Sequence, residues 1–119
     1  MSQELEDRFH NYGVRVRGFC IKLKRDIINT EYIRQVIRAS GSVGGNYIEA
    51  SDERMRIKIS RREAKESIHW LDLILTDGND ELEKEPLELM DEGIQIKKIL
   101  SAILKKARTL NLRFLCFEP

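Results

Sequence analysis

The densest cluster of chemically active side chains is a basic run near the middle of the chain. Six of the twelve residues from 54 to 65 are Arg or Lys, and only Glu63 is acidic. Such side chains neutralise phosphates and release the counterions held by a polyanion. The run therefore predicts a nucleic-acid contact made by Arg54, Arg56, Lys58, Arg61, Arg62 and Lys65.

Two other interpretations of this run remain open. It can be a solvated helix face, paired with nearby carboxylates such as Asp52 and Glu53. It can also meet the acidic stretch 77–92, which carries eight carboxylates, on a neighbouring subunit. A second basic group lies where we expect the last helix to end, and cations are favoured at a helix C-terminus without any ligand. This group is Lys97, Lys98, Lys105, Lys106 and Arg108.

Two motifs have the spacing of metal ligands on a helix. Glu66 and His69 form an E-x-x-H motif, and Asp7 and His10 form a D-x-x-H motif. Di-iron bundles place two such motifs in one layer of the core. The first and third helices of an up-and-down bundle are parallel, so an early His10 and a late His69 fall at opposite ends. We therefore expect no metal site and no cofactor.

Nucleophilic and acid–base catalysis have little support in the sequence. Glu49 and Asn46 lie one turn apart on a predicted helix, but no second acid or base converges on them. Cys20 belongs to an apolar stripe and is expected to pack as a small hydrophobe. Residues 42–45 lack the pattern of a phosphate-binding loop. We expect no catalytic residue and a protein that is not an enzyme.

Length and composition indicate one folded domain, residues 1–119. The chain is 41% hydrophobic and 34% charged, and its formal net charge of +1 names no partner. No apolar run approaches the length of a membrane span. Cys20 and Cys116 form neither a disulfide framework nor a zinc pattern, and the first ten residues do not resemble a secretion signal. These features favour a protein of the reducing cytoplasm that makes no membrane contact.

Apolar residues recur at helical spacing in four segments. The spacing predicts helices at about 3–24, 31–50, 52–76 and 86–108, with a hydrophobic tail at 109–119 that alternates more like a strand or is simply an extension. Asn29 or Thr30 is a plausible N-cap of the second helix, and Pro86 fits the first position of the fourth. Short connections between four amphipathic helices predict an all-α, antiparallel up-and-down four-helix bundle.

The second helix contains a group of small residues that permits close approach of another helix. Trp70 in the third helix is expected to fill the core or an interface rather than stack on bases. The residues that we assign to helix packing or to an interface are Gly41, Gly44, Gly45, Asn46, Tyr47, Glu49, Glu66 and Trp70.

Two stretches resemble one known family. Residues 37–50 (IRASGSVGGNYIEA) and 62–71 (REAKESIHWL) are similar to the paired helix signatures of the four-helix-bundle proteins encoded in intervening sequences of bacterial 23S ribosomal RNA genes. The likeness covers roughly residues 8–107. It implies a bundle that assembles into a ring, as a homopentamer, and it implies no established activity. The accessory proteins of diversity-generating retroelements resemble this family in fold, and they bind nucleic acid and a reverse transcriptase.

The apolar residues outnumber what one small bundle buries, and large exposed apolar patches mark contacts. They predict self-association and include Ile27, Ile28, Ile48, Ile74, Leu110, Leu112, Phe114 and Phe117.

Three functions follow as hypotheses. The favoured one is a non-enzymatic oligomeric scaffold or adaptor that binds nucleic acid, with structured RNA preferred to DNA, through a basic surface repeated by symmetry. The alternative is a protein-interaction accessory module that holds a separate catalytic partner, such as a reverse-transcriptase-like protein, without binding nucleic acid. A metal-dependent bundle enzyme is the third and the least supported.

Overall fold

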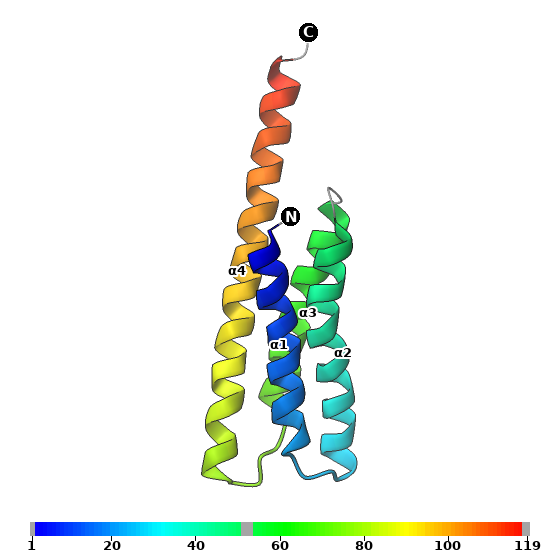
Figure 1. Cartoon of the computed structure of the whole chain (residues 1–119), viewed down its shortest axis with the longest axis vertical. Coiled ribbons are helices and arrows are strands. Elements are labelled where there is room, and N and C mark those ends of the chain that lie inside the picture. Colours follow the sequence, from blue (N-terminus) through cyan, green and yellow to red (C-terminus); the bar gives the residue numbers. More distant parts are fainter. Residues whose placement is uncertain (1, 51–53, 118–119) are drawn as a thin grey trace.

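The computed structural model describes the backbone of residues 2–50 and 54–117, and the side chains among them up to residue 106. Within these ranges the chain forms four helices and no strand: α1 (Gln3–Ile21), α2 (Ile27–Ala50), α3 (Arg54–Leu73) and α4 (Asp80–Phe117). The molecule is an elongated rod of 63 × 23 × 21 Å (Figure 1). The structure confirms the predicted all-α four-helix bundle.

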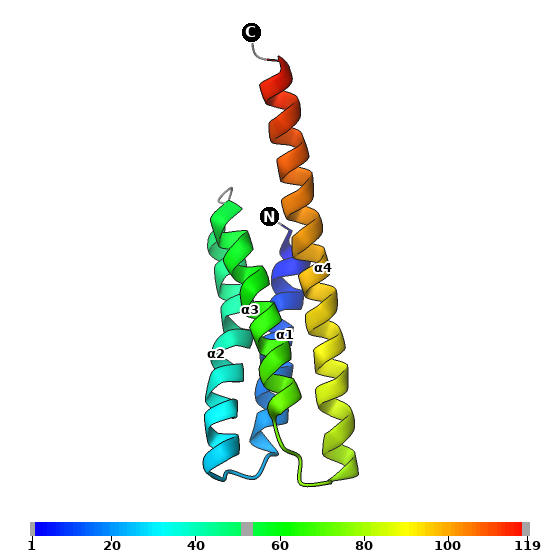
Figure 2. The same ribbon diagram turned by 180° about the vertical axis from the view of Figure 1, so that it is seen from behind.

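Successive helices run in opposite directions and each packs on its neighbours in the chain. Contacts join α1 to α2, α2 to α3, α3 to α4, and α4 back to α1. Figure 2 shows α3 between α2 and α4 on one side of the bundle. Short connections force this order, because each turn is too short to carry the chain across the bundle.

The core is a cluster of buried apolar side chains from all four helices. The Phe9 and Tyr47 rings meet edge to face with centroids 4.8 Å apart. The buried hydroxyls of Tyr12 and Ser67 share a hydrogen bond of 2.7 Å, so the polar end of Tyr12 is satisfied. Ile74, predicted to be part of an apolar excess, is buried with this core.

The second helix begins four residues earlier than its spacing predicts. The carboxylate of Asp26 accepts a 2.7 Å hydrogen bond from the Asn29 backbone N–H, and the Asp26 carbonyl accepts from Thr30 N. Asp26 is therefore the residue that caps α2, and the assignment of Asn29 or Thr30 as the cap is wrong.

The side chain of Asn29 instead ties two connections together. It is fully buried, and its amide nitrogen donates to the carbonyls of Lys24 and Leu75, at 3.2 and 2.8 Å. Its amide oxygen accepts a 3.0 Å hydrogen bond from Leu75 N. This side chain therefore joins the α1–α2 connection to the end of α3.

The fourth helix is longer at both ends than predicted. Asn79 caps its start, since its Oδ1 atom accepts from the backbone of Glu81 and Leu82 at 3.0 and 3.4 Å. Pro86 consequently lies inside the helix, not at its first position. The helix also continues to Phe117, so the strand-like tail expected at 109–119 is wrong up to that residue.

With 38 residues, α4 is about 57 Å long and projects beyond the other helices at its C-terminal end (Figure 1). Lys105 and Lys106 therefore lie in the helix interior. The expected attraction of cations to the helix C-terminus does not account for their positive charges. The side chains of Leu110, Leu112, Phe114 and Phe117 fall outside the described ones.

Candidate nucleic-acid interface

The basic run folds as the outer face of α3. Its inner face, which includes Ile57, Ser60 and Ala64, is buried against the bundle. The Ser60 hydroxyl donates a 2.7 Å hydrogen bond to the Val43 carbonyl and so attaches α3 to α2. Lys58, Arg62 and Lys65 are spaced by four and three residues, so they lie on one face of the helix. All three are exposed.

Four residues of the run line a groove between α3 and α4. We call this the basic groove: Lys58, Arg61, Arg62 and Lys65 from α3, with Lys97 and Ser101 from α4. Its volume is about 490 Å³, and its described lining holds no carboxylate. Nη1 of Arg61 donates to the Ser101 hydroxyl at 3.4 Å, which bridges the two helices across the groove.

Among the described residues, the cations of the basic groove have no carboxylate partner within ion-pair distance. No described carboxylate forms an ion pair with Lys58, Arg62, Lys65 or Lys97. Elsewhere, cations do find partners: Nη2 of Arg8 lies 2.7 Å from a carboxylate oxygen of Glu92. Five positive side chains with no matching negative charge in the groove leave a concave surface suited to an anion.

Two carboxylates of α3, those of Glu63 and Glu66, point to α2 instead. Glu63 is only 6% exposed, and its carboxylate lies 3.1 Å from Nη1 of Arg38 on α2. Nη2 of the same arginine lies 2.9 Å from Glu66. The hydrogen bond to Glu66 raises the pKa of Arg38 above its ordinary value. This fork keeps both carboxylates out of the basic groove.

Two predicted contact residues do not line the groove. Arg54 is exposed at the first position of α3. Arg56 turns toward α2, where it lies 3.5 Å from the Glu49 carboxylate and donates to the Asn46 amide oxygen at 3.3 Å. Lys97 was assigned to a separate basic group, because only the fold reveals that it faces α3.

The small residues of α2 divide by what they contact. A Cβ atom at Gly44 would lie 3.5 Å from the backbone of Phe9 and His10, so α1 approaches closely there. At Gly41 and Gly45 a Cβ atom would meet nothing within 4 Å.

The two aromatic residues assigned to packing or to an interface differ in burial. Tyr47 is buried, and Trp70 is half-buried with its ring centroid 6.0 Å from that of Tyr32.

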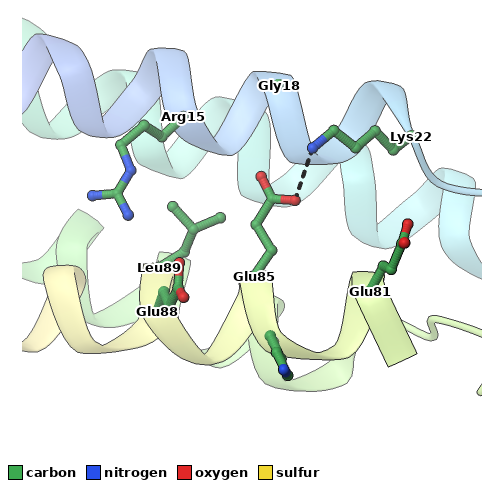
Figure 3. A pocket seen from close by; sticks show the side chains of 8 residues that line it. Arg15, Gly18, Lys22, Glu81, Glu85, Glu88 and Leu89 are labelled. Carbon is green, nitrogen blue, oxygen red and sulfur yellow. Dashed lines mark hydrogen bonds and ion pairs between the residues drawn. The ribbon is translucent and has the colours of Figure 1, made fainter. Parts of the chain in front are cut away.

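A second cleft lies between α1 and α4, with a volume of about 370 Å³ (Figure 3). Arg15 of α1 and Lys22, the residue that follows α1, line one side of it, whereas Glu81, Glu85 and Glu88 line it from α4. Lys22 Nζ lies 3.1 Å from the Glu85 carboxylate, which bridges the cleft. Mixed and partly paired charges make this cleft a poor match for a polyanion.

The described residues form neither a metal site nor a membrane-spanning helix. No group of three or more His, Cys, Asp and Glu side chains there is placed to hold a metal ion. Over the same part of the chain, no helix combines the length with the apolar character that a membrane crossing needs.

Comparisons with protein-family models, with curated proteins and with solved structures found no match for this chain.

Proposed function

We propose that this chain is a non-enzymatic adaptor of the cytoplasm that assembles into a ring and binds structured RNA through the basic groove. The observation that carries the proposal is the convergence of Lys58, Arg61, Arg62 and Lys65 with Lys97 on one open groove that lacks a carboxylate. The expectation of a nucleic-acid partner also draws on the accessory proteins of diversity-generating retroelements, which bind nucleic acid and resemble the ribosomal RNA intervening-sequence proteins in fold. The sequence resemblance to the intervening-sequence proteins is the source of the pentameric ring.

The dimensions of the basic groove suit a nucleic-acid strand. Lys58 and Lys65 are seven residues apart, which is about 10 Å along the helix. At about 3.4 Å of helix axis per charge on one strand, this span matches roughly three phosphates. A single groove of this size binds weakly, and its repetition around a ring would supply avidity for a long strand.

Exposed apolar residues support self-association. Ile27 is 92% exposed and Ile48 is 55% exposed, although both are large and apolar. Single exposed apolar side chains are normal, whereas a contiguous apolar surface marks a contact, and Ile37 and Ile48 border one such surface where α1 meets α2. Assembly would remove them from water while the basic groove stays open.

Salt dependence of RNA binding tests the basic groove. We expect Lys58→Gln combined with Arg62→Gln to reduce the slope of log affinity against log salt by about 1.5, because each lost phosphate contact removes about 0.7–0.9. The matched control is Lys24→Gln with Arg25→Gln, which removes two exposed cations from the α1–α2 connection. Both slopes are measured with one structured RNA by fluorescence anisotropy from about 50 to 200 mM salt.

A slope that is equal in the two double variants would contradict the groove assignment. Absence of RNA binding at low salt, together with recovery of a polymerase-like protein in a pull-down, would favour the accessory module that holds a catalytic partner.

A further inference from the structure

An apolar groove runs along the outer face where α1 and α2 meet. Its volume is about 390 Å³. Ile37 and Ile48 border it on α2 and are 43% and 55% exposed. Val14 lines it from α1. We call this surface the α1–α2 groove, and it lies on different helices from those that form the basic groove.

No contact within the described chain explains why positions 41 and 45 in the α1–α2 groove are glycine. A Cβ atom at Gly41 or Gly45 would meet no atom within 4 Å, yet each glycine destabilises a helix by about 1 kcal/mol relative to alanine. Both lie between Ile37 and Ile48, with steps of four, four and three residues, so all four share one helix face. This face offers bare backbone flanked by apolar side chains, which suits an incoming helix.

The α1–α2 groove presents basic side chains and, in its described lining, no acidic ones. His10 and Arg17 line it, and its described lining contains no carboxylate. Arg17 forms no ion pair with any described residue. An occupant of this groove should therefore combine an apolar ridge with carboxylates beside it.

The first half of α4 carries such a ridge. Leu87, Met90 and Ile94 follow one another at helical spacing; Leu87 is 66% exposed, whereas Ile94 is half-buried and Met90 is half-buried against the core. Glu83 and Asp91 lie one turn before and one turn after Leu87, and both are exposed. Neither carboxylate forms an ion pair with a described residue. We call these five residues the α4 ridge.

The α4 ridge and the α1–α2 groove agree in length and in charge spacing. Glu83 to Ile94 and Ile37 to Ile48 each span eleven residues, or about 16 Å of helix. The two ridge carboxylates are eight residues apart, about 12 Å, and His10 and Arg17 are seven residues apart, about 10 Å.

We propose that the α4 ridge of one copy docks into the α1–α2 groove of a second copy. This inference rests on the assembly in the proposed function and identifies the surfaces that would form it. Because the ridge and the groove lie on different faces of one chain, the contact is heterologous, and repetition of such a contact produces a closed ring or an open filament.

Substitution of the open glycines tests the close approach. We expect Gly41→Ala combined with Gly45→Ala to keep the fold, to raise the urea stability of the dissociated chain, and to weaken assembly at least tenfold. The control is Gly18→Ala, since a Cβ atom at Gly18 also meets nothing within 4 Å and Gly18 lies outside this groove. Assembly is followed by sedimentation velocity over a concentration series. Equal assembly of the double variant, the control and the unchanged chain would overturn the proposal.

Charge reversal tests the choice of occupant. Reversal of the groove (His10→Glu with Arg17→Glu) or of the ridge (Glu83→Lys with Asp91→Lys) should each weaken assembly at least tenfold, and the chain that carries all four changes should assemble again. If two grooves faced each other instead, reversing the groove alone would leave like charges opposed as before and change little. That result, or a failure of the fourfold variant to recover with its helical circular dichroism intact, would refute the ridge as occupant.

These outcomes separate the inference from the proposed function. If the glycine and charge variants assemble as the unchanged chain does, the proposed ring stands and only the proposed interface is refuted. If the unchanged chain has a mass of 13.9 kDa at micromolar concentration, both the proposed ring and the proposed interface are refuted. RNA binding at the basic groove is measured separately by its salt slope.

Discussion

At the scale of single residues, the polar side chains inside the bundle determine how its ends and layers are joined. Asn29 satisfies three backbone groups from two connections, and a buried group that loses its partner is costly. Residue type alone suggested a cap here, because asparagine is common at helix starts. The distinction required the fold, which brings residue 75 within reach of residue 29.

We expect Asn29→Ala to destabilise the chain by about 2–4 kcal/mol, because the buried Asn29 amide makes three hydrogen bonds, and the Leu75 N–H and the carbonyls of Lys24 and Leu75 lose this partner. The exposed neighbour Thr30→Ala is the control and should change the unfolding free energy by less than about 1 kcal/mol. Urea unfolding followed by circular dichroism measures both. A loss below 1 kcal/mol for Asn29→Ala would show that these hydrogen bonds are not needed.

Alkaline pH should destabilise the chain through two buried acids. Burial raises the pKa of Tyr12 to about 12 and that of the Cys20 thiol to about 11, from 10.0 and 9.0. Both groups are neutral when protonated, so the folded chain retains their protons where the unfolded chain releases them. The stability that this adds is complete below about pH 9 and is lost as the pH rises through 9–11 for Cys20 and through 10–12 for Tyr12.

Removal of the Tyr12 hydroxyl should abolish the second of these losses. We expect Tyr12→Phe to lower stability by about 1 kcal/mol at pH 7, through its lost hydrogen bond, and to reduce the decline between pH 10 and 12 by roughly 2–3 kcal/mol. Urea unfolding in reducing buffer at five values between pH 8 and 12 gives both curves. Parallel curves for the two chains would contradict the assignment.

At the scale of elements, a glycine can mark a helix contact that leaves no room for a Cβ atom. A Cβ atom at Gly93 of α4 would lie 2.8 Å from Ile68 Cγ1 and 2.8 Å from the Tyr12 hydroxyl. No motif indicated this contact, because an isolated glycine in a helical pattern does not show which neighbour it faces.

We expect Gly93→Ala to destabilise the chain by about 1–3 kcal/mol, since the displacement of Ile68 and Tyr12 outweighs the helix propensity gained. Gly18→Ala meets no atom and should stabilise the chain by up to about 1 kcal/mol. The two thermal midpoints, compared with that of the unchanged chain, should therefore move in opposite directions. Shifts of the same sign would contradict this account of the α1–α3–α4 contact.

The helix bounds show what local patterns predict well and where they fail. Apolar spacing identified four helices and their antiparallel order, because it reflects the buried stripe of each one. It misplaced the start of α4, where Pro86 resembles a first residue although Asn79 makes the capping hydrogen bonds. It also assigned the end of α4 to a separate tail, since the apolar residues there alternate over a short window.

At the scale of the whole molecule, the candidate site depends on which helix faces become neighbours. The basic run on α3 was visible as a sequence feature, and four of its six predicted residues line the basic groove. Lys97 joins them only because α4 packs beside α3, and Arg56 leaves them because α2 provides Glu49. The spacing of residues within one helix predicts neither the position of Lys97 nor that of Arg56.

The two surfaces that we propose for binding lie on different faces of the molecule. The basic groove lies between α3 and α4, whereas the α1–α2 groove lies across the bundle between the other two helices. Separate faces allow one chain to contact its neighbours and a polyanion at the same time, which a ring-forming adaptor requires.

The most direct test of this account is sedimentation velocity of the purified chain at micromolar concentration, alone and with a structured RNA in about 50 mM salt. We predict one closed species whose mass is several times 13.9 kDa and which sediments together with the RNA. A single chain of 13.9 kDa that sediments apart from the RNA would contradict it.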